Sequence, residues 1–229
     1  MDYLWDVSNK MTYNNRTGKY KFRKEYSFII NNVKGNKLNI LDICGGSGRF
    51  ALPLAANNNN KVSVVDINNE AIDILKQHNN KITTYCVDFN EFETKLKYDL
   101  IIMIEAIGYF QNKDLVIKKT NDLLNPNGLF IFQITNPKSW RYTLRKLKKI
   151  VKRRTDYYEP SIEEVISKLQ NNFFEIIEID GFNWLPLSLS SNSIFVRFFE
   201  IIESLFKLNR ILNQSPWLMI CAKKVKSNL

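Results

Sequence analysis

The sequence predicts an α/β fold built on a seven-stranded, mostly parallel sheet, with helices on both faces and an antiparallel last strand. Short apolar runs alternate with amphipathic runs from residue 38 to residue 137, and this alternation is typical of βαβ units in a parallel sheet. The short runs are almost continuously apolar, as in strands that are covered on both faces. Two further strand-like runs near the end of the chain complete the sheet, separated by about thirty residues.

The first five strands are expected at residues 39–44, 61–67, 82–89, 98–104 and 129–135. The helices between them begin and end at residues that favour such boundaries. Asn68 is expected to cap the helix that contains Ile72 and Leu75. The segment 125–128, Asn-Pro-Asn-Gly, is expected to end the preceding helix near Leu124.

Beyond residue 137 the pattern changes. Ser161 and Glu164 have the spacing of a capping box, so a short helix is expected to begin there. The last two strands are expected at residues 173–182 and 216–224, with a helical insertion between them. One apolar face of the inserted helix is formed by Phe195, Phe198, Phe199, Ile202, Leu205 and Phe206. We expect this face to pack in the core; a lid, a dimer face and a membrane contact are the alternatives.

Composition disfavours several classes of protein. The three cysteines, Cys44, Cys86 and Cys221, form no C-x-x-C pair, so a disulfide framework and a common zinc site are not expected. We therefore expect no metal and a reducing, cytoplasmic location. The first ten residues lack the apolar segment of a signal peptide, and Glu105 interrupts the longest apolar run. No repeat is visible, which disfavours a solenoid.

The net charge of +10 has a local origin. Nine of the 33 basic residues lie between Lys138 and Arg154, and the rest of the chain has 24 basic and 23 acidic residues. Apolar residues recur there at helical spacing, at Trp140, Leu144, Leu147 and Val151. This pattern predicts a basic amphipathic helix, which suits an anionic membrane surface or a phosphate-bearing acceptor. A solvated helix without a ligand is the alternative.

Three of the eight glycines lie in Gly45-Gly46-Ser47-Gly48, between an apolar strand and a helix-type run. Glycines at such a turn let the chain reverse sharply and let a ligand approach the main chain. The N–H groups at the start of the following helix offer hydrogen-bond donors. The segment therefore predicts a site for a nucleotide-like ligand, with a plain tight turn as the alternative.

Residues 41–50, Leu-Asp-Ile-Cys-Gly-Gly-Ser-Gly-Arg-Phe, resemble the glycine-rich motif of class I S-adenosylmethionine-dependent methyltransferases. That family has the pattern acidic-x-Gly-x-Gly-x-Gly, and Cys44 stands in place of the first glycine. Other matching positions follow in the order of the family, at Asp66, at Val87-Asp88-Phe89, at 98–101 and at 124–128. The resemblance covers residues 38–137 and is looser over the last two strands.

The resemblance implies a Rossmann-like fold, S-adenosylmethionine as the cofactor and methyl transfer as the activity. It implies that Asp66 accepts hydrogen bonds from the ribose hydroxyls, that Asp88 receives the adenine amino group and that Phe89 packs on the adenine ring. The cofactor-binding residues that it predicts are Asp42, Cys44, Gly45, Gly46, Gly48, Asp66, Ile67, Asp88, Phe89 and Ile104.

The whole chain, residues 1–229, is expected to form a single methyltransferase domain, because its length and its 45% hydrophobic content suit one core. The expected parts are an N-terminal helical cap (1–37), a cofactor-binding core (38–137), a basic helical segment (138–172) and a helical insertion (182–215).

Physical chemistry favours the same acidic residues. Asp66 and Asp88 end neighbouring parallel strands, at the edge where such sheets bind ligands, and a carboxylate supplies the acceptor pair that a vicinal diol needs. Helix capping is the alternative for each. Asp42 lies in an apolar strand, where an unpaired carboxylate is costly. We therefore expect it to accept N–H bonds from the loop or to face the cofactor.

Two other functions are compatible with parts of the chain. Residues 46–51 fit the looser dinucleotide fingerprint, so an NAD(P)-dependent oxidoreductase is the main enzymatic alternative. A nucleic-acid-binding or nucleic-acid-methylating protein that uses the basic segment is the second. Amino-group methylation of bases is disfavoured because the motif N/D/S-P-P-Y/F, expected after the fourth strand, is absent.

The acceptor is expected to be a small molecule, with a phosphate-bearing sugar, a lipid-linked intermediate and a quinone-like lipid as candidates. The layout of the family places Glu105 and Tyr109 where a catalytic base would lie, and Tyr109, Asn136 and Trp140 where the acceptor would bind. The sequence does not choose between oxygen, nitrogen and carbon as the acceptor atom. It also leaves open a homodimer and a peripheral contact with an anionic membrane surface.

Overall fold

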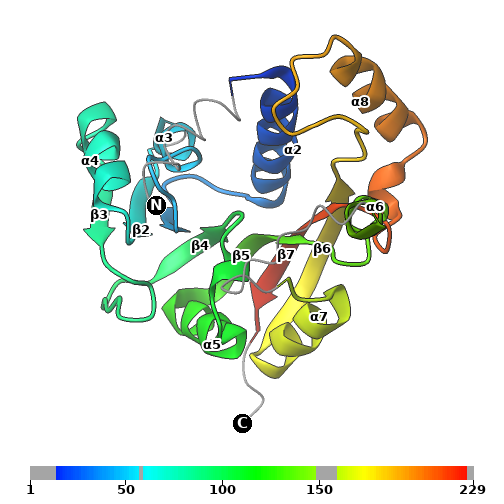
Figure 1. The fold of residues 1–229 in the computed structure, drawn as a ribbon. Coiled ribbons are helices and arrows are strands. Elements are labelled where there is room, and N and C mark those ends of the chain that lie inside the picture. Colours follow the sequence, from blue (N-terminus) through cyan, green and yellow to red (C-terminus); the bar gives the residue numbers. More distant parts are fainter. Residues whose placement is uncertain (1–13, 57–58, 148–158, 226–229) are drawn as a thin grey trace.

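A computed structural model of the chain describes residues 14–56, 59–147 and 159–225 (Figure 1). Seven strands form one sheet in the order β3-β2-β1-β4-β5-β7-β6. Their bounds are Asn39–Ile43 (β1), Lys61–Asp66 (β2), Thr83–Cys86 (β3), Tyr98–Met103 (β4), Leu124–Thr135 (β5), Phe174–Phe182 (β6) and Trp217–Lys224 (β7). The first five pair in parallel, and β7 runs antiparallel to both β5 and β6. The predicted mixed α/β sheet with an antiparallel last strand is confirmed.

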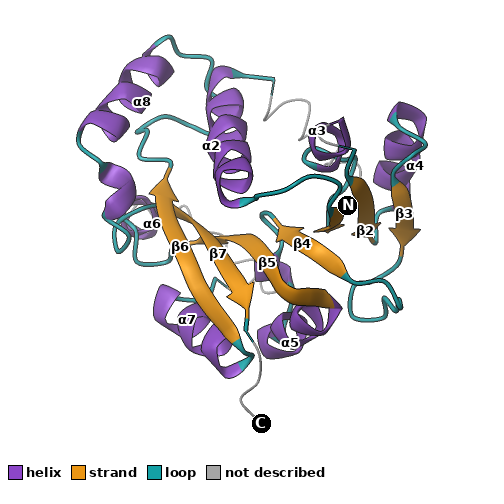
Figure 2. Cartoon of the chain, turned by 180° about the vertical axis from the view of Figure 1, so that it is seen from behind, coloured by secondary structure: helices purple, strands orange, loops and turns teal. Residues whose placement is uncertain are grey.

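Helices cover both faces of this sheet (Figure 2). They are α2 (Arg16–Asn32), α3 (Ala51–Ala56), α4 (Asn69–His78), α5 (Lys113–Leu123), α6 (Trp140–Leu147), α7 (Ile162–Asn171) and α8 (Phe195–Leu205), with short 3-10 turns at Ile107–Tyr109 (η1) and Leu208–Arg210 (η2). The two predicted caps are confirmed: the side chain of Asn68 accepts the N–H of Ala71 at 3.1 Å, and that of Ser161 accepts the N–H of Glu164 at 3.2 Å.

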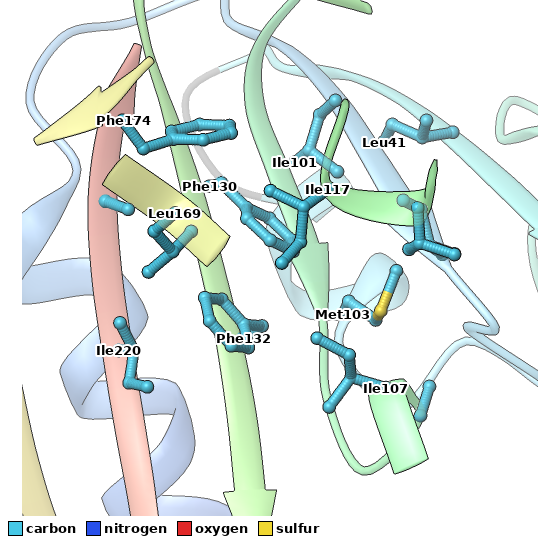
Figure 3. Packing of buried hydrophobic residues seen from close by; sticks show 14 of the residues in the cluster. Leu41, Ile101, Met103, Ile107, Ile117, Phe130, Phe132, Leu169, Phe174 and Ile220 are labelled. Atoms are coloured by element: carbon cyan, nitrogen blue, oxygen red, sulfur yellow. The ribbon is translucent and has the colours of Figure 1, made fainter. Parts of the chain in front are cut away.

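Alternating residues of each strand point into two separate hydrophobic layers. In β1, Leu41 and Ile43 belong to the layer under α5 and α7, which Figure 3 shows, whereas Ile40 belongs to the layer under α2, α3 and α4. All three side chains are fully buried. The sheet is therefore covered on both faces, which explains why its strands read as nearly continuous apolar runs.

Two strands differ from the sequence expectation. β3 spans only Thr83–Cys86, so Val87, Asp88 and Phe89 follow the strand instead of ending it. β5 begins at Leu124, before the turn residues, because the turn forms a bulge inside the strand. Tyr98 pairs with Leu124 and Leu100 with Leu129, which leaves the intervening turn unpaired against β4.

The inserted helix α8 differs from our expectation of core packing, because most of its predicted apolar face is exposed, although Phe199 is partly buried against Tyr20, Leu185 and Val196. Phe195 and Phe198 are 58% and 55% exposed, and Leu205 is 72% exposed. Glu203 is buried instead. The cause is α2, whose cations attract the acidic side chains of α8 inward. The basic segment begins as α6, and residues 148–154 of the predicted basic helix lie outside the described residues.

Candidate cofactor and acceptor site

The glycine-rich loop leaves β1 in a series of left-handed residues. Cys44, Gly46 and Gly48 have φ values of 57°, 53° and 89°. The loop is tied to the sheet because the N–H of Cys44 donates to the carbonyl of Val65 at 2.7 Å. Cys44, which replaces the first glycine of the family motif, therefore has a conformation that favours glycine.

Gly45 is required for a different reason, because its main chain lies close to the side chain of Asp42. A Cβ atom at this position would lie 2.7 Å from the carboxyl group of Asp42 and 3.0 Å from Val64. Any larger residue would push Asp42 away from the loop. The glycine thus brings the main chain against a buried carboxyl group at the floor of the site.

Asp66 joins the loop to the next helix. One carboxylate oxygen accepts the N–H of Gly46 and the other accepts the N–H of Asn68, both at 2.8 Å. A carboxylate oxygen has two lone pairs, so each can accept one more hydrogen bond. The expected acceptor pair for a diol is therefore held rigidly at the carboxyl end of β2.

Asp42 is buried within β1, and its Oδ2 has no hydrogen-bond partner among the described residues. Burial raises the pKa of Asp42 well above its usual value, the charge of Asp66 raises it further, and a backbone hydrogen bond from Ala51 opposes the shift. This carboxyl oxygen beside the glycine-rich loop thus finds no donor within the described part of the chain.

These groups border an open pocket with a volume of about 280 Å³. Its walls come from the glycine-rich loop, the ends of β1 and β2 and the segment after β4. The lining residues are Asp42, Cys44, Gly45, Gly46, Ser47, Arg49, Phe50, Asp66, Ile67, Asn68, Ala71, Ile104, Glu105, Ala106 and Tyr109. Seven of the ten predicted cofactor-binding residues are therefore brought to one place.

The other three predicted cofactor residues do not line the pocket. Gly48 packs against α4, where a Cβ atom would lie 2.5 Å from Leu75. Phe89 is 3% exposed and belongs to the core layer under α5. One carboxylate oxygen of Asp88 accepts the N–H of Asn90 at 2.7 Å. Asp88 and Phe89 follow β3 instead of ending it, which explains why neither lines the pocket.

The predicted acceptor residues also separate into two groups. Glu105 and Tyr109 lie on the pocket wall. Asn136 does not: its side-chain amide donates to the carbonyls of Leu212, Asn213 and Ser215 at 3.0–3.1 Å, and so fixes the chain before β7. Trp140 opens α6 and does not line the pocket. Asn136 is therefore placed as a structural residue.

A partly buried cluster of two cations and two carboxylates adjoins the pocket, and sequence reasoning missed it. Lys21 of α2 contacts Glu105 directly and lies 3.8 Å from Glu25. Arg49 lies 3.6 Å from both Glu25 and Glu105. The side chains of Lys21 and Glu25 are 4% and 0% exposed. We call these four residues the charge cluster.

Burial shapes the proton affinities of the charge cluster. It lowers the pKa of Lys21 to about 8 and raises that of Glu25 to about 7, and in each case the oppositely charged partner opposes the shift. Burial also lowers the pKa of Arg49 to about 9. Groups with such values beside a pocket are candidates for a functional site.

The resemblance to the methyltransferase family also makes Tyr13, Arg16 and Arg23 candidates to meet the methionine carboxylate of the cofactor. Tyr13 lies outside the described residues, and Arg16 and Arg23 are exposed on the side of α2 that faces α8. Lys21 is the residue of α2 that reaches the site. Its Nζ also lies 4.0 Å from the ring centre of Trp217 in β7.

The thiol of Cys44 faces the pocket. Desolvation by its surroundings raises the pKa of this thiol, and the charges of Asp66, Asp42 and Asp88 add to the shift. The thiol therefore stays protonated at neutral pH, and a thiolate nucleophile is not expected here.

A glycine-rich turn at the carboxyl edge of a mixed sheet with this strand order defines the class I methyltransferase fold. A family model described as a methyltransferase domain matches residues 14–186. The chain belongs to the S-adenosylmethionine-dependent methyltransferases, and an NAD(P)-dependent oxidoreductase is not retained. S-adenosylmethionine is the cofactor that this membership assigns.

Curated relatives give the same family. Over 205 residues the chain is 30% identical to the ubiquinone biosynthesis O-methyltransferase of Rickettsia prowazekii, a match that covers 80% of this chain and 79% of the relative. The protein of the same name from Rickettsia akari is 30% identical over 164 residues, which is 66% of this chain and 64% of the relative. This chain thus spans a little under two thirds of the Rickettsia akari protein.

Solved structures share the fold at low sequence identity. Magnesium protoporphyrin IX methyltransferase from Synechocystis is 14% identical with a TM-score of 0.66, over 91% of this chain and 84% of that one. An S-adenosylmethionine-dependent methyltransferase from Mesorhizobium loti is 16% identical with a TM-score of 0.64, over 93% of this chain and 100% of that one.

No helix among the described residues is long and apolar enough to cross a membrane.

Proposed function

We propose that this protein transfers a methyl group from S-adenosylmethionine to the hydroxyl oxygen of an aromatic, quinone-type acceptor. The observation that carries this proposal is the position of Glu105, a carboxylate on the pocket wall directly after β4. A hydroxyl acceptor must lose its proton during transfer, whereas a neutral amine needs no strong base before attack. The curated relatives are named as O-methyltransferases of ubiquinone biosynthesis, which supports an aromatic hydroxyl as the acceptor.

The residues of the pocket fit the cofactor. The carboxylate of Asp66 supplies acceptors for the ribose hydroxyls, and the main chain at Gly45 and Gly46 lies open to an adenosyl group. Arg49 is the cation of the pocket wall and would face the cofactor's carboxylate. When bound, the cofactor supplies a sulfonium-activated methyl group, so the protein mainly has to position the acceptor and exclude water.

Glu105 has a backbone conformation that supports a functional role. Its φ value is 60°, in the left-handed region that residues with side chains seldom adopt. The residue lies on the pocket wall, with Lys21 and Arg49 as partners for the carboxylate. We assign to Glu105 the acceptance of the hydroxyl proton, and Lys21 and Arg49 hold its carboxylate in position.

The walls near Glu105 suit an uncharged aromatic ring. Ile104 and Ala106 flank it, and Tyr109 and Ile67 line the same pocket. A phosphate-bearing acceptor is less well matched, because its phosphate would lie beside the carboxylate of Glu105 on the pocket wall. Tyr109 lines the pocket, is 38% exposed and would contact the acceptor ring.

The test is a labelled-methyl assay with a catechol, an alkylated catechol and a primary amine as acceptors. We expect transfer to the catechols, and a fall in kcat of roughly 100-fold or more for Glu105→Gln, the usual contribution of a positioned base. Cofactor affinity, measured by calorimetry, should change little in this variant. Methylation of the amine alone, or an unchanged kcat for Glu105→Gln with a catechol, would overturn the proposal.

A further inference from the structure

The outward face of α8 is an apolar surface surrounded by cations. Six large apolar side chains in and beside this helix are more than half exposed: Ile194, Phe195, Phe198, Ile201, Leu205 and Phe206. Ile194, Phe198, Ile201 and Leu205 follow one another at helical spacing, so they form a continuous stripe. We call the six residues the α8 face.

The acidic residues of this segment point inward and are neutralised. Between residues 183 and 213 the only acids are Glu200 and Glu203. Glu203 is 1% exposed, accepts the hydroxyl of Tyr20 at 2.5 Å and pairs with Lys24 at 3.0 Å. Glu200 pairs with Arg23 and Arg197, both at 3.0 Å. These contacts fix which side of α8 faces α2.

The polar contacts of Glu200 and Glu203 with α2 therefore determine the orientation of α8 and leave the α8 face exposed to solvent. Both views place α8 beside α2 at the periphery, away from the centre of the sheet (Figures 1 and 2). Only Val196 of α8 packs inward as a buried apolar residue, against Tyr20 and Leu185. Exposing so much apolar surface is costly unless something else covers it.

Cations surround the α8 face. Arg16, Lys19, Arg23 and Arg197 line a shallow hollow beside Ile194. Lys207 and Arg210, at the other end of the helix, are exposed as well. The surface thus combines protruding aromatic and aliphatic side chains with a positive rim, which is the composition of an interfacial helix on an anionic bilayer.

We infer that the α8 face docks on the surface of a membrane that contains anionic lipids. A second copy of this chain is a poorer match, because a two-fold contact would bring the positive rims of both copies together. α8 follows β6, which runs in the same direction as β1 to β5, so the face lies on the edge of the sheet that carries the pocket. This inference stands independently of the proposed acceptor.

The test is co-sedimentation of the full chain with vesicles of phosphatidylcholine alone and of phosphatidylcholine with phosphatidylglycerol. We expect binding to the anionic vesicles, weakened by salt, and little binding to the neutral ones. The variant Phe195→Ser/Phe198→Ser/Leu205→Ser should bind at least tenfold more weakly. Lys19→Glu/Arg210→Glu should lose about fivefold or more per cation.

Leu115→Ser is the matched control, because Leu115 is 50% exposed on α5, far along the chain from the α8 face. It should bind vesicles as the wild type does. Thermal unfolding of each variant shows whether it folds, and light scattering gives its oligomeric state. The inference is overturned if the triple variant binds vesicles normally, or if the wild type is a dimer that this variant converts to a monomer.

Discussion

Glu25 offers a direct measurement of the charge cluster, because its carboxyl group is completely buried and its pKa is raised to about 7 by burial. In the unfolded chain the pKa of a glutamate is about 4.5. Between these two values the folded protein binds the proton and the unfolded chain does not. This group therefore stabilises the fold fully below pH 4.5, and that contribution is lost as the pH rises through 7.

The size of the effect follows from the two pKa values. Each pH unit changes the free energy of unfolding by about 1.4 kcal/mol, so the whole interval amounts to about 3 kcal/mol. Glu25→Gln cannot ionise and should lose this slope. Urea unfolding of the wild type and the variant at pH values from 4 to 8 gives the difference in the free energy of unfolding at each pH, in which titrating groups that do not interact with Glu25 cancel.

The matched control is Glu91→Gln, since Glu91 is exposed on the surface. As the pH rises, we expect the difference in the free energy of unfolding between the wild type and Glu25→Gln to change by about 3 kcal/mol in favour of the variant. The corresponding difference for Glu91→Gln should not change with pH. A flat difference for Glu25→Gln would show that Glu25 is not buried beside Lys21 as the structure places it, and the electrostatic description of the cluster would fall with it.

Two further predictions concern the cofactor loop. Cys44→Gly removes a side chain from a residue with a φ of 57°. This relieves about 1–2 kcal/mol of backbone strain in the folded state. The greater freedom of glycine in the unfolded chain offsets about 0.5–1 kcal/mol of that gain. Chemical denaturation should show equal or slightly higher stability, and a loss of more than about 1 kcal/mol would contradict the assigned backbone strain. Asp66→Asn should weaken the binding of S-adenosylhomocysteine, measured by calorimetry, by roughly tenfold or more. Asp88 does not line the pocket, so Asp88→Asn should change this affinity little. Equal losses of affinity in the two variants would place Asp88 at the cofactor.

The parallel core could be predicted because its signals are local. Nearly continuous apolar runs mark strands buried on both faces, and Asn68 and Ser161 mark helix starts by a hydrogen bond within one turn. The bulge in β5 has no such signal. It depends on a contact between segments, in which the amide of Asn125 donates to Asp99 at 2.7 Å.

The site could be predicted where a strand end fixes it. Asp42, Asp66 and Glu105 are placed by β1, β2 and β4, so strand order alone brings them together. Lys21 has no distinguishing local feature, since α2 contains several other cations. Its role appears only when the helix is docked on the sheet. Phe89 packs in the core and does not line the pocket, because β3 ends at Cys86.

The orientation of α8 shows why an amphipathic pattern alone does not say which face is buried. The apolar residues of α8 recur at helical spacing, but Glu203 and its partners on α2 determine which side of the helix is buried. The same helix α2 directs Lys21 to the pocket wall and Tyr20 to α8. Neighbouring residues of a helix point about 100° apart, so one rigid helix contacts both surfaces through adjacent positions. The proposed docking face on α8 and the proposed proton acceptor Glu105 are therefore connected by a single element, whose ion pairs on either side fix its position.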